Sequence, residues 1–569
     1  MNSTRRSNWA GLLLALPVAL VAAPALGQTS RPSDQRLDVK LPPVGASSAA
    51  LRLPPIPPLR RDPAARDGTI RVDRVRVLGS SVLSNPDLEP IVAPYLTRPL
   101  HAEDLVELRD AVTRLYIDRG YLNSGALIPE QNVQSGVLEI EVVEGSLEKV
   151  EVVGAEQFRP DYFTAELLRP GDGPLNVREL EQRLQVLRTD PRIQRLEARL
   201  VPGERRGQSR LELDILETSR WGLGFASAND RSSTIGSESG RADLAYRNLT
   251  GNGDELQFGI GMTEGAEELR AAYTLPLLDS DTLLNVDYRD SEADIVNSAF
   301  EEVGIDSFST TYGAGIEHAL FRTPTNELVL GLRGELRESL TRIDGEETTF
   351  SLGAEDGESR VSALRASQSW TTRSQSDVFA LRSTMSFGLD ILDASNDTTR
   401  RTFSQRERPP DGTFVAWLLQ AQWAHRLPEQ YRGSQVLWRM DAQVTPRSLL
   451  SLEQFSLGGA RTVRGYRENE LVRDNGIATS LELRVPILRT ALGRDVLQVA
   501  PFFDFGHGWN DGETPPIKTI ASYGAGLRYQ AADGVFMSIY YGEPLRRYER
   551  SVDDLQNHGF HFQVSVAAF

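Results

Sequence analysis

The sequence predicts a transmembrane β-barrel of about sixteen antiparallel strands, preceded by two small periplasmic α/β domains. Three observations support this fold class. A secretory signal opens the chain, an order of strand, helix, helix, strand and strand occurs twice between residues 69 and 217, and a glycine-rich alternation of apolar and polar residues runs from about residue 219 almost to the end. A length of 569 residues fits several domains.

The N-terminal segment predicts export from the cytoplasm. Arg5 and Arg6 precede an apolar run from Trp9 to Ala23, and Ala25-Leu26-Gly27 supplies the small residues of a cleavage site. We therefore expect residues 1–27 to be a signal peptide for general secretion. Residues 28–68 are rich in proline and are expected to form an extended linker, in which Ser47 to Leu53 can form only a short helix.

Hydropathy, cysteine count and net charge exclude several classes of protein for this chain. No later segment has the apolar length of a transmembrane helix, whereas the strands of a membrane barrel keep the mean hydropathy low because lipid-facing and lumen-facing side chains alternate. The zero cysteine count excludes disulfides and thiolate metal sites, and the net charge of -17 argues against a nucleic-acid partner.

The two α/β units, residues 69–145 and 146–218, are predicted to share one element order. Hydrophobic periodicity places strands at 70–78, 126–129, 137–143, 150–153, 193–200 and 211–216, and helices at 88–96, 102–118, 162–168 and 177–187. Asn176 is expected to cap a helix, and Gly203 and Gly207 to form a turn.

Residues 219–569 are predicted to form the barrel. Candidate strands begin near Trp221, Ala242, Leu256, Leu269, Thr282, Ser309, Leu328, Arg360, Val378, Thr413, Gln435, Ile477, Val496, Tyr523, Val535 and Gly559. Every second connection is short, whereas the alternate ones are longer and polar, except near Glu264 to Glu267. An outer-membrane barrel has short periplasmic turns and long external loops, and it therefore predicts this alternation of connection lengths. A soluble β-sandwich does not predict it.

Two residues stand out within this pattern. Arg464 lies in a long connection, and Asp504 lies on a later strand, where it shares a face with Phe502 and Gly506. If the other face meets lipid, Asp504 points into the barrel, where a carboxylate requires a cation or water. Arg464 can reach it from a folded-in loop because Gly465 permits a sharp bend. From the residues alone, an ordinary solvated loop arginine is an equally good interpretation.

The α/β units resemble the POTRA domain, a periplasmic module of outer-membrane translocation proteins. Tyr116, Gly120 and Tyr121 look like the Tyr-x-x-x-Gly-Tyr segment of the first such domain in two-partner secretion transporters. Pro174-Leu175-Asn176 is similar to a segment of their second domain. The resemblance implies a surface that accepts an extended polypeptide at a strand edge or groove.

With a signal, two POTRA-like units, a barrel and the loop motif Val463-Arg464-Gly465-Tyr466 in this order, nearly the whole mature chain resembles the haemolysin secretion/activation family of two-partner secretion transporters. The resemblance implies that loop 445–476 folds into the barrel, and that Arg464 pairs with Asp504 of the strand motif Phe502-x-Asp504-x-Gly506. Family members often plug the pore with an N-terminal helix. The prolines of residues 28–68 leave room for a short plug helix at most.

The resemblance implies a transporter in the outer membrane, with its N-terminal domains in the periplasm. Its partner is expected to be a large exoprotein, haemolysin- or adhesin-like, whose N-terminal secretion domain is captured unfolded and passed through the barrel. Outer-membrane lipid, and the barrel-assembly machinery during biogenesis, are the other expected partners; no cofactor or metal is expected.

Two alternatives remain open. An insertase of the same superfamily would fold other barrels, although such proteins usually carry more POTRA repeats. An outer-membrane enzyme lacks support, because the chain contains neither Gly-x-Ser-x-Gly nor His-Glu-x-x-His, and Glu238 takes the nucleophile position between Gly236 and Gly240.

Overall fold

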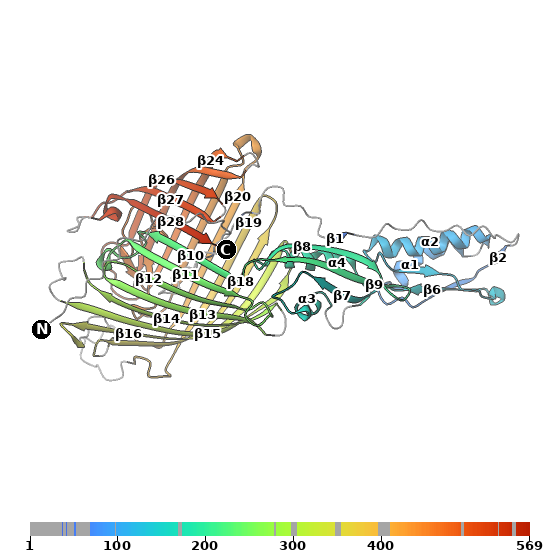
Figure 1. The fold of residues 1–569 in the computed structure, drawn as a ribbon, viewed down its shortest axis with the longest axis horizontal. Coiled ribbons are helices and arrows are strands. Elements are labelled where there is room, and N and C mark those ends of the chain that lie inside the picture. The colour runs from blue at the N-terminus through green and yellow to red at the C-terminus, as the bar shows by residue number, and fades with distance from the viewer. Residues whose placement is uncertain are drawn as a thin grey trace.

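The protein consists of a closed barrel and an arm of two α/β units that extends from one end of it (Figure 1). The computed structural model describes residues 37, 41, 51–52, 69–96, 98–168, 173–277, 280–296, 304–347, 354, 356–396, 410–490, 494–532, 534–548 and 554–568. The expected signal peptide, residues 1–27, and most of the expected linker lie outside these ranges. Among the described helices, none has the length and apolar character required to cross a membrane.

The first α/β unit packs two helices against a small sheet. Its elements are β2 (Ile70–Arg71), β3 (Arg74–Leu78), α1 (Asn85–Val92), β4 (Pro99–Leu100), α2 (Ala102–Asp118), β5 (Gly125–Leu127) and β6 (Val137–Val143), with sheet order β3-β6-β5. The strand expected at 70–78 is divided, because the N–H groups of Asp73 and Arg74 both donate to Gly136 O and β2 pairs with β4 instead. Leu108, Val112 and Tyr116 of α2 are buried in the core.

The second unit contains β7 (Ser146–Val153), α3 (Pro160–Leu167), α4 (Val177–Leu187), β8 (Ile193–Pro202) and β9 (Gln208–Glu217). As predicted, the Asn176 side chain caps α4 by accepting from Arg178 N at 3.0 Å. The predicted turn is also present: Gly203 N donates to Gln208 O, and Gly207 has φ +81°.

The expectation of a helix at Ser47 to Leu53 is wrong for the part of that segment that the structure describes. Leu51 and Arg52 form a strand, β1 (Leu51–Arg52), which pairs in parallel with Ala198 and Arg199 of β8. The sheet order is therefore β1-β8-β9-β7. An extended segment satisfies the free backbone groups at the edge of β8, and Leu51 packs against the core of the unit, whereas a helix at these residues would leave that edge unpaired.

Within the described residues the barrel has sixteen long antiparallel strands, because the two-residue β17 (Glu346–Glu347) only extends the tip of its neighbour. The strands are β10 (Trp221–Ala228), β11 (Ser239–Arg247), β12 (Glu255–Met262), β13 (Ala266–Pro276), β14 (Thr282–Asp294), β15 (Ile305–Arg322), β16 (Asn326–Ile343), β18 (Glu358–Arg373), β19 (Asp377–Leu389), β20 (Val415–Arg426), β21 (Gln435–Val444), β24 (Asn475–Arg489), β25 (Asp495–Trp509), β26 (Thr519–Ala532), β27 (Val535–Pro544) and β28 (Phe560–Ala568). The ring closes where β28 pairs with β10. The predicted fold class is confirmed.

The two faces of the strands differ as the alternation predicts. On β25, Phe503 is 48% exposed, whereas its neighbours Phe502 and Asp504 are buried. Apolar side chains thus cover the outside of the barrel, and polar side chains point into the lumen. The short turns lie toward the arm, because Arg159 N of the second unit donates to Gly251 O, and the Ser280 hydroxyl donates to Glu166 Oε2 at 2.7 Å.

Candidate functional site in the barrel lumen

The connection between β21 and β24 folds into the lumen and packs on its wall. It carries a small hairpin of β22 (Phe455–Leu457) and β23 (Leu471–Arg473). The buried apolar residues of this loop meet those of the strands in one cluster, which consists of Leu418, Phe455, Leu457, Val463, Tyr466, Leu471, Ala478 and Ile520. Because the cluster joins loop and strands, the loop has a defined position inside the barrel.

Arg464 of this loop lies against Asp504 of β25. Its Nε and Nη2 donate to the two carboxylate oxygens of Asp504 at 2.8 and 2.9 Å, and its backbone N–H donates to the same carboxylate at 3.0 Å. Asp504 is 0% exposed and Arg464 6%. A bidentate pair with both groups buried fixes the direction of the guanidinium plane as well as the position of the loop.

Four further wall residues complete the surroundings of the guanidinium. Nη1 donates to Glu482 Oε2 at 2.5 Å, and Nη2 donates to Ser480 Oγ at 3.0 Å. The guanidinium carbon lies 3.6 Å from the ring centre of Phe502 and 4.7 Å from that of Tyr540. Two carboxylates and two aromatic faces therefore compensate for the water that Arg464 loses.

The other residues of the predicted motifs lie around this pair. Tyr466 is fully buried, and its hydroxyl donates to Ala521 O at 3.2 Å. Val463 is also buried, and Gly506 leaves the space that it occupies: a Cβ at Gly506 would lie 3.0 Å from Val463 Cγ2. The N–H of Gly465 donates to His561 Nε2 at 3.0 Å.

The expected segment of the first unit lies elsewhere, at the joint between the two α/β units. Tyr116 is fully buried, and its ring makes an edge contact with that of Tyr121, with centroids 6.1 Å apart. Gly120 follows α2 with φ +96°, and its carbonyl accepts from Val177 N at the start of α4. A Cβ at Gly120 would lie 2.6 Å from Asn176 Oδ1, so glycine permits the close contact between the units.

Sequence reasoning missed Glu482, Ser480, Tyr540 and His561 as members of the site. The alternation of β24 places Ser480 and Glu482 in the lumen, but only the strand register shows that Ser480 lies opposite Asp504 and Glu482 opposite Phe502. Tyr540 and His561 are brought in by β27 and β28. The described residues contain no cluster of side chains suited to hold a metal ion.

Replacing Gly465 by valine is expected to displace the loop. Gly465 has φ +90°, and a Cβ there would lie 2.6 Å from the backbone oxygen of Gly542 on β27, which cannot yield as a side chain can. We expect external protease to cleave the loop in whole cells carrying Gly465→Val. Gly345→Val is the matched control, because Gly345 has φ +80° with no atom within 4 Å of an added Cβ. Equal cleavage in both variants would contradict the role of the close contact.

Comparisons with known proteins agree with this architecture. The family model described as haemolysin secretion/activation protein ShlB/FhaC/HecB matches residues 207–529, and that of the POTRA domain, ShlB-type, matches residues 70–145. The outer membrane transporter CdiB of Escherichia coli is 27% identical over 486 residues, which are 82% of this chain and 76% of CdiB. The hemolysin transporter protein ShlB of Serratia marcescens is 25% identical over 488 residues, which are 80% of this chain and 79% of ShlB.

A solved structure of CdiB from Escherichia coli has the same fold. It matches with a TM-score of 0.68 at 24% sequence identity, and the match covers 90% of this chain and 94% of that one. At this identity the likeness concerns the fold alone. The fold and the order of the units thus agree with the two family matches.

Proposed function

The chain belongs to the haemolysin secretion/activation family ShlB/FhaC/HecB, and on that premise we propose that it is an outer-membrane transporter of two-partner secretion. The barrel is its conduit, and the two POTRA domains, placed at 69–145 and 146–218, face the periplasm. The partner is a large secreted exoprotein, haemolysin- or adhesin-like, which is captured unfolded and translocated to the cell surface.

One observation carries the proposal: a polar barrel lumen is crossed by a loop that Arg464 ties to Asp504 and Glu482 through buried ion pairs. A loop held in this way keeps the conduit closed between export events, and it can move aside when the pairs are replaced by water or by a passing chain. Arg464 and Asp504, with Val463, Gly465, Tyr466, Phe502 and Gly506 around them, therefore act on conformation, and no catalytic role is assigned to them.

The POTRA domains supply the capture surface. In the second unit an extended segment, β1, already lies along the edge of β8 and makes parallel pairs with it. This pairing supports the proposal that a sheet edge in the arm accepts an extended stretch of the partner, with backbone hydrogen bonds that do not depend on sequence. Tyr116, Gly120 and Tyr121 would keep the two domains in the orientation that this capture requires. Since the periplasm offers no ATP, folding of the partner outside the cell is the proposed driving force.

A gene deletion tests the proposal against the insertase alternative. The exported proteins and the outer-membrane proteins of wild type and deletion strain are compared by mass spectrometry. A transporter predicts the loss of one large exoprotein from the surface and the medium, with the other barrels retained. General loss of outer-membrane barrels would instead support an insertase, and restoration by the plasmid-borne gene is the control.

A further inference from the structure

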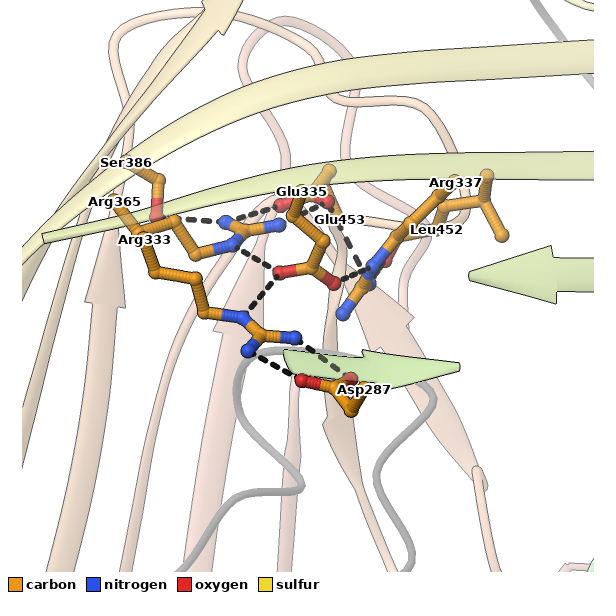
Figure 2. Close-up of polar contacts among 8 residues, drawn as sticks. All are labelled: Asp287, Arg333, Glu335, Arg337, Arg365, Ser386, Leu452 and Glu453. Atoms are coloured by element: carbon orange, nitrogen blue, oxygen red, sulfur yellow. Dashed lines mark hydrogen bonds and ion pairs between the residues drawn. The ribbon is translucent and has the colours of Figure 1, made fainter. Parts of the chain in front are cut away.

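A second buried ion cluster holds the same lumenal loop at a different part of the wall (Figure 2). Glu453 of the loop is 2% exposed. Its Oε1 accepts from Arg365 Nη2 at 2.7 Å, and its Oε2 accepts from Arg365 Nη1 at 3.0 Å. Arg337 Nη1 lies 3.5 Å from Glu453 Oε1 and donates to the neighbouring backbone oxygen of Leu452 at 3.0 Å. The contact has the bidentate geometry of the Arg464–Asp504 pair, with the charges of loop and wall reversed.

The wall cluster is incomplete without the loop. The strands contribute Arg333, Arg337 and Arg365 to this cluster, and the carboxylates of Asp287 and Glu335 pair with them (Figure 2). Glu335 is shared by all three arginines through ion pairs. Glu453 supplies the third negative charge, so that this group of six side chains is neutral only while the loop is docked. A buried cationic surplus is unfavourable, and the wall thus attracts the loop at this point.

The two clusters lie in different sectors of the barrel. Arg337 and Arg365 belong to β16 and β18, whereas Glu482 and Asp504 belong to β24 and β25, and β19, β20 and β21 separate the two pairs in the ring. A third contact joins Arg461 of the loop to Asp230, just after β10, at 3.1 Å. The loop is thus attached to three separate sectors of the circumference and bridges the lumen between them.

Apolar packing accompanies the Glu453 cluster as it accompanies the Arg464 pair. Leu449 and Leu450 of the lumenal loop pack with Val361 and Ala363 of β18 and with Phe414, which directly precedes β20. An apolar contact alone would hold the loop without a means of release. The attraction within a buried ion pair is largely offset by lost hydration, so such a pair fixes geometry and can open when water enters.

We propose that Glu453 is a second positioning residue of the gating loop, and that the conduit opens fully only when both the Glu453–Arg365 and the Arg464–Asp504 contacts are released. The inference deepens the proposed function and rests on it for its biological meaning. It concerns the protein without its partner, however, so its test requires no secreted exoprotein.

The absence of native cysteine permits a direct test on the purified full-length protein. Ser456, which is buried on β22 between the two contacts, is replaced by cysteine, and the rate of its reaction with a water-soluble maleimide is measured. Glu453→Gln in this background is expected to raise the rate about tenfold, the change that corresponds to ~1.4 kcal/mol. In planar bilayers, channels of the Glu453→Gln variant are expected to open more often than wild-type channels. Channels of the double variant, Glu453→Gln with Arg464→Ala, are expected to open more often than those of either single variant.

Two variants complete the design. Arg447→Gln is the matched control, because it also removes one charge from this loop, but at an exposed side chain whose Nη1 donates to Thr413 O at 3.1 Å. It is expected to label and conduct like wild type. Glu453→Asp keeps the charge on a shorter side chain and should label at an intermediate rate; this result would stand if Glu453→Gln did not assemble.

Wild-type labelling and conductance in an assembled Glu453→Gln barrel, or no further opening in the double variant, would overturn the proposal. These outcomes do not depend on the deletion experiment. A loop held by the Arg464–Asp504 contact alone is compatible with secretion, and a loop held by both contacts is compatible with an insertase.

Discussion

Arg464→Ala is expected to abolish most export of the partner while the barrel still assembles. The substitution leaves Asp504 buried without its cation, whereas Glu482 loses Arg464 but keeps its ion pair with Arg484 at 2.6 Å. The loss of one partner from a buried pair typically amounts to about 3–5 kcal/mol. Such a change shifts the loop from docked to displaced in most molecules. The conduit then opens more often, but we expect export to fail because the loop no longer returns to one defined position between export events. Export is measured as exoprotein in the medium relative to the cells, and assembly as the heat-dependent mobility of the folded barrel in electrophoresis.

Graded variants separate the geometry of this pair from its charge. Arg464→Lys keeps the positive charge but cannot make the two parallel hydrogen bonds to Asp504 or the planar contact with Phe502, so we expect export between that of wild type and Arg464→Ala. Arg447→Ala, on the exposed part of the same loop, should export normally. Full export by assembled Arg464→Ala would show that the pair has no role in transport.

The barrel could be predicted well from the sequence, because the patterns that identify it lie within single strands and single connections. Alternation along each strand determines which side chains face lipid, and the length of each connection determines on which side it lies. Each of the sixteen long barrel strands among the described residues corresponds to a predicted start, as with the start expected near Trp221 and found at β10 (Trp221–Ala228). The inward direction of Asp504 follows from the same rule, applied to a single strand.

The rest of the site depends on contacts between distant residues. Alternation places Glu482 inside the barrel, but its distance from Arg464 depends on the register of β24 and on the path of the loop. Glu453 could not be identified in this way, because the alternation of side chains applies to strands and not to loops. Its partners on β16 and β18 lie about 90 to 120 residues earlier in the chain. Leu51 forms β1 for a similar reason: the edge of β8, about 150 residues later, decides its conformation.

The Tyr116 side chain is expected to be required for the folded first POTRA domain. The ring is 0% exposed, and its hydroxyl donates to Glu144 Oε1 at 3.0 Å and lies 2.7 Å from the hydroxyl of Ser80. Burial raises the pKa of Tyr116 to about 12, so the hydroxyl remains a donor over the whole working range of pH. Tyr116→Ala would leave a large cavity and cost about 3–5 kcal/mol, which is a large share of the stability of a domain of this size.

Limited proteolysis of the purified full-length protein measures this effect, because folded barrel and arm are cleaved at different rates. In Tyr116→Ala we expect rapid loss of the arm, an intact barrel fragment and loss of export, since the capture surface is gone. Tyr116→Phe removes only the hydroxyl and should lower the free energy of unfolding by ~1 kcal/mol. Tyr121→Phe, on the partly buried neighbouring ring, is the matched control. If Tyr116→Ala lost the arm but still exported its partner, capture by the POTRA domains would have to be abandoned, and the barrel alone would have to select the cargo.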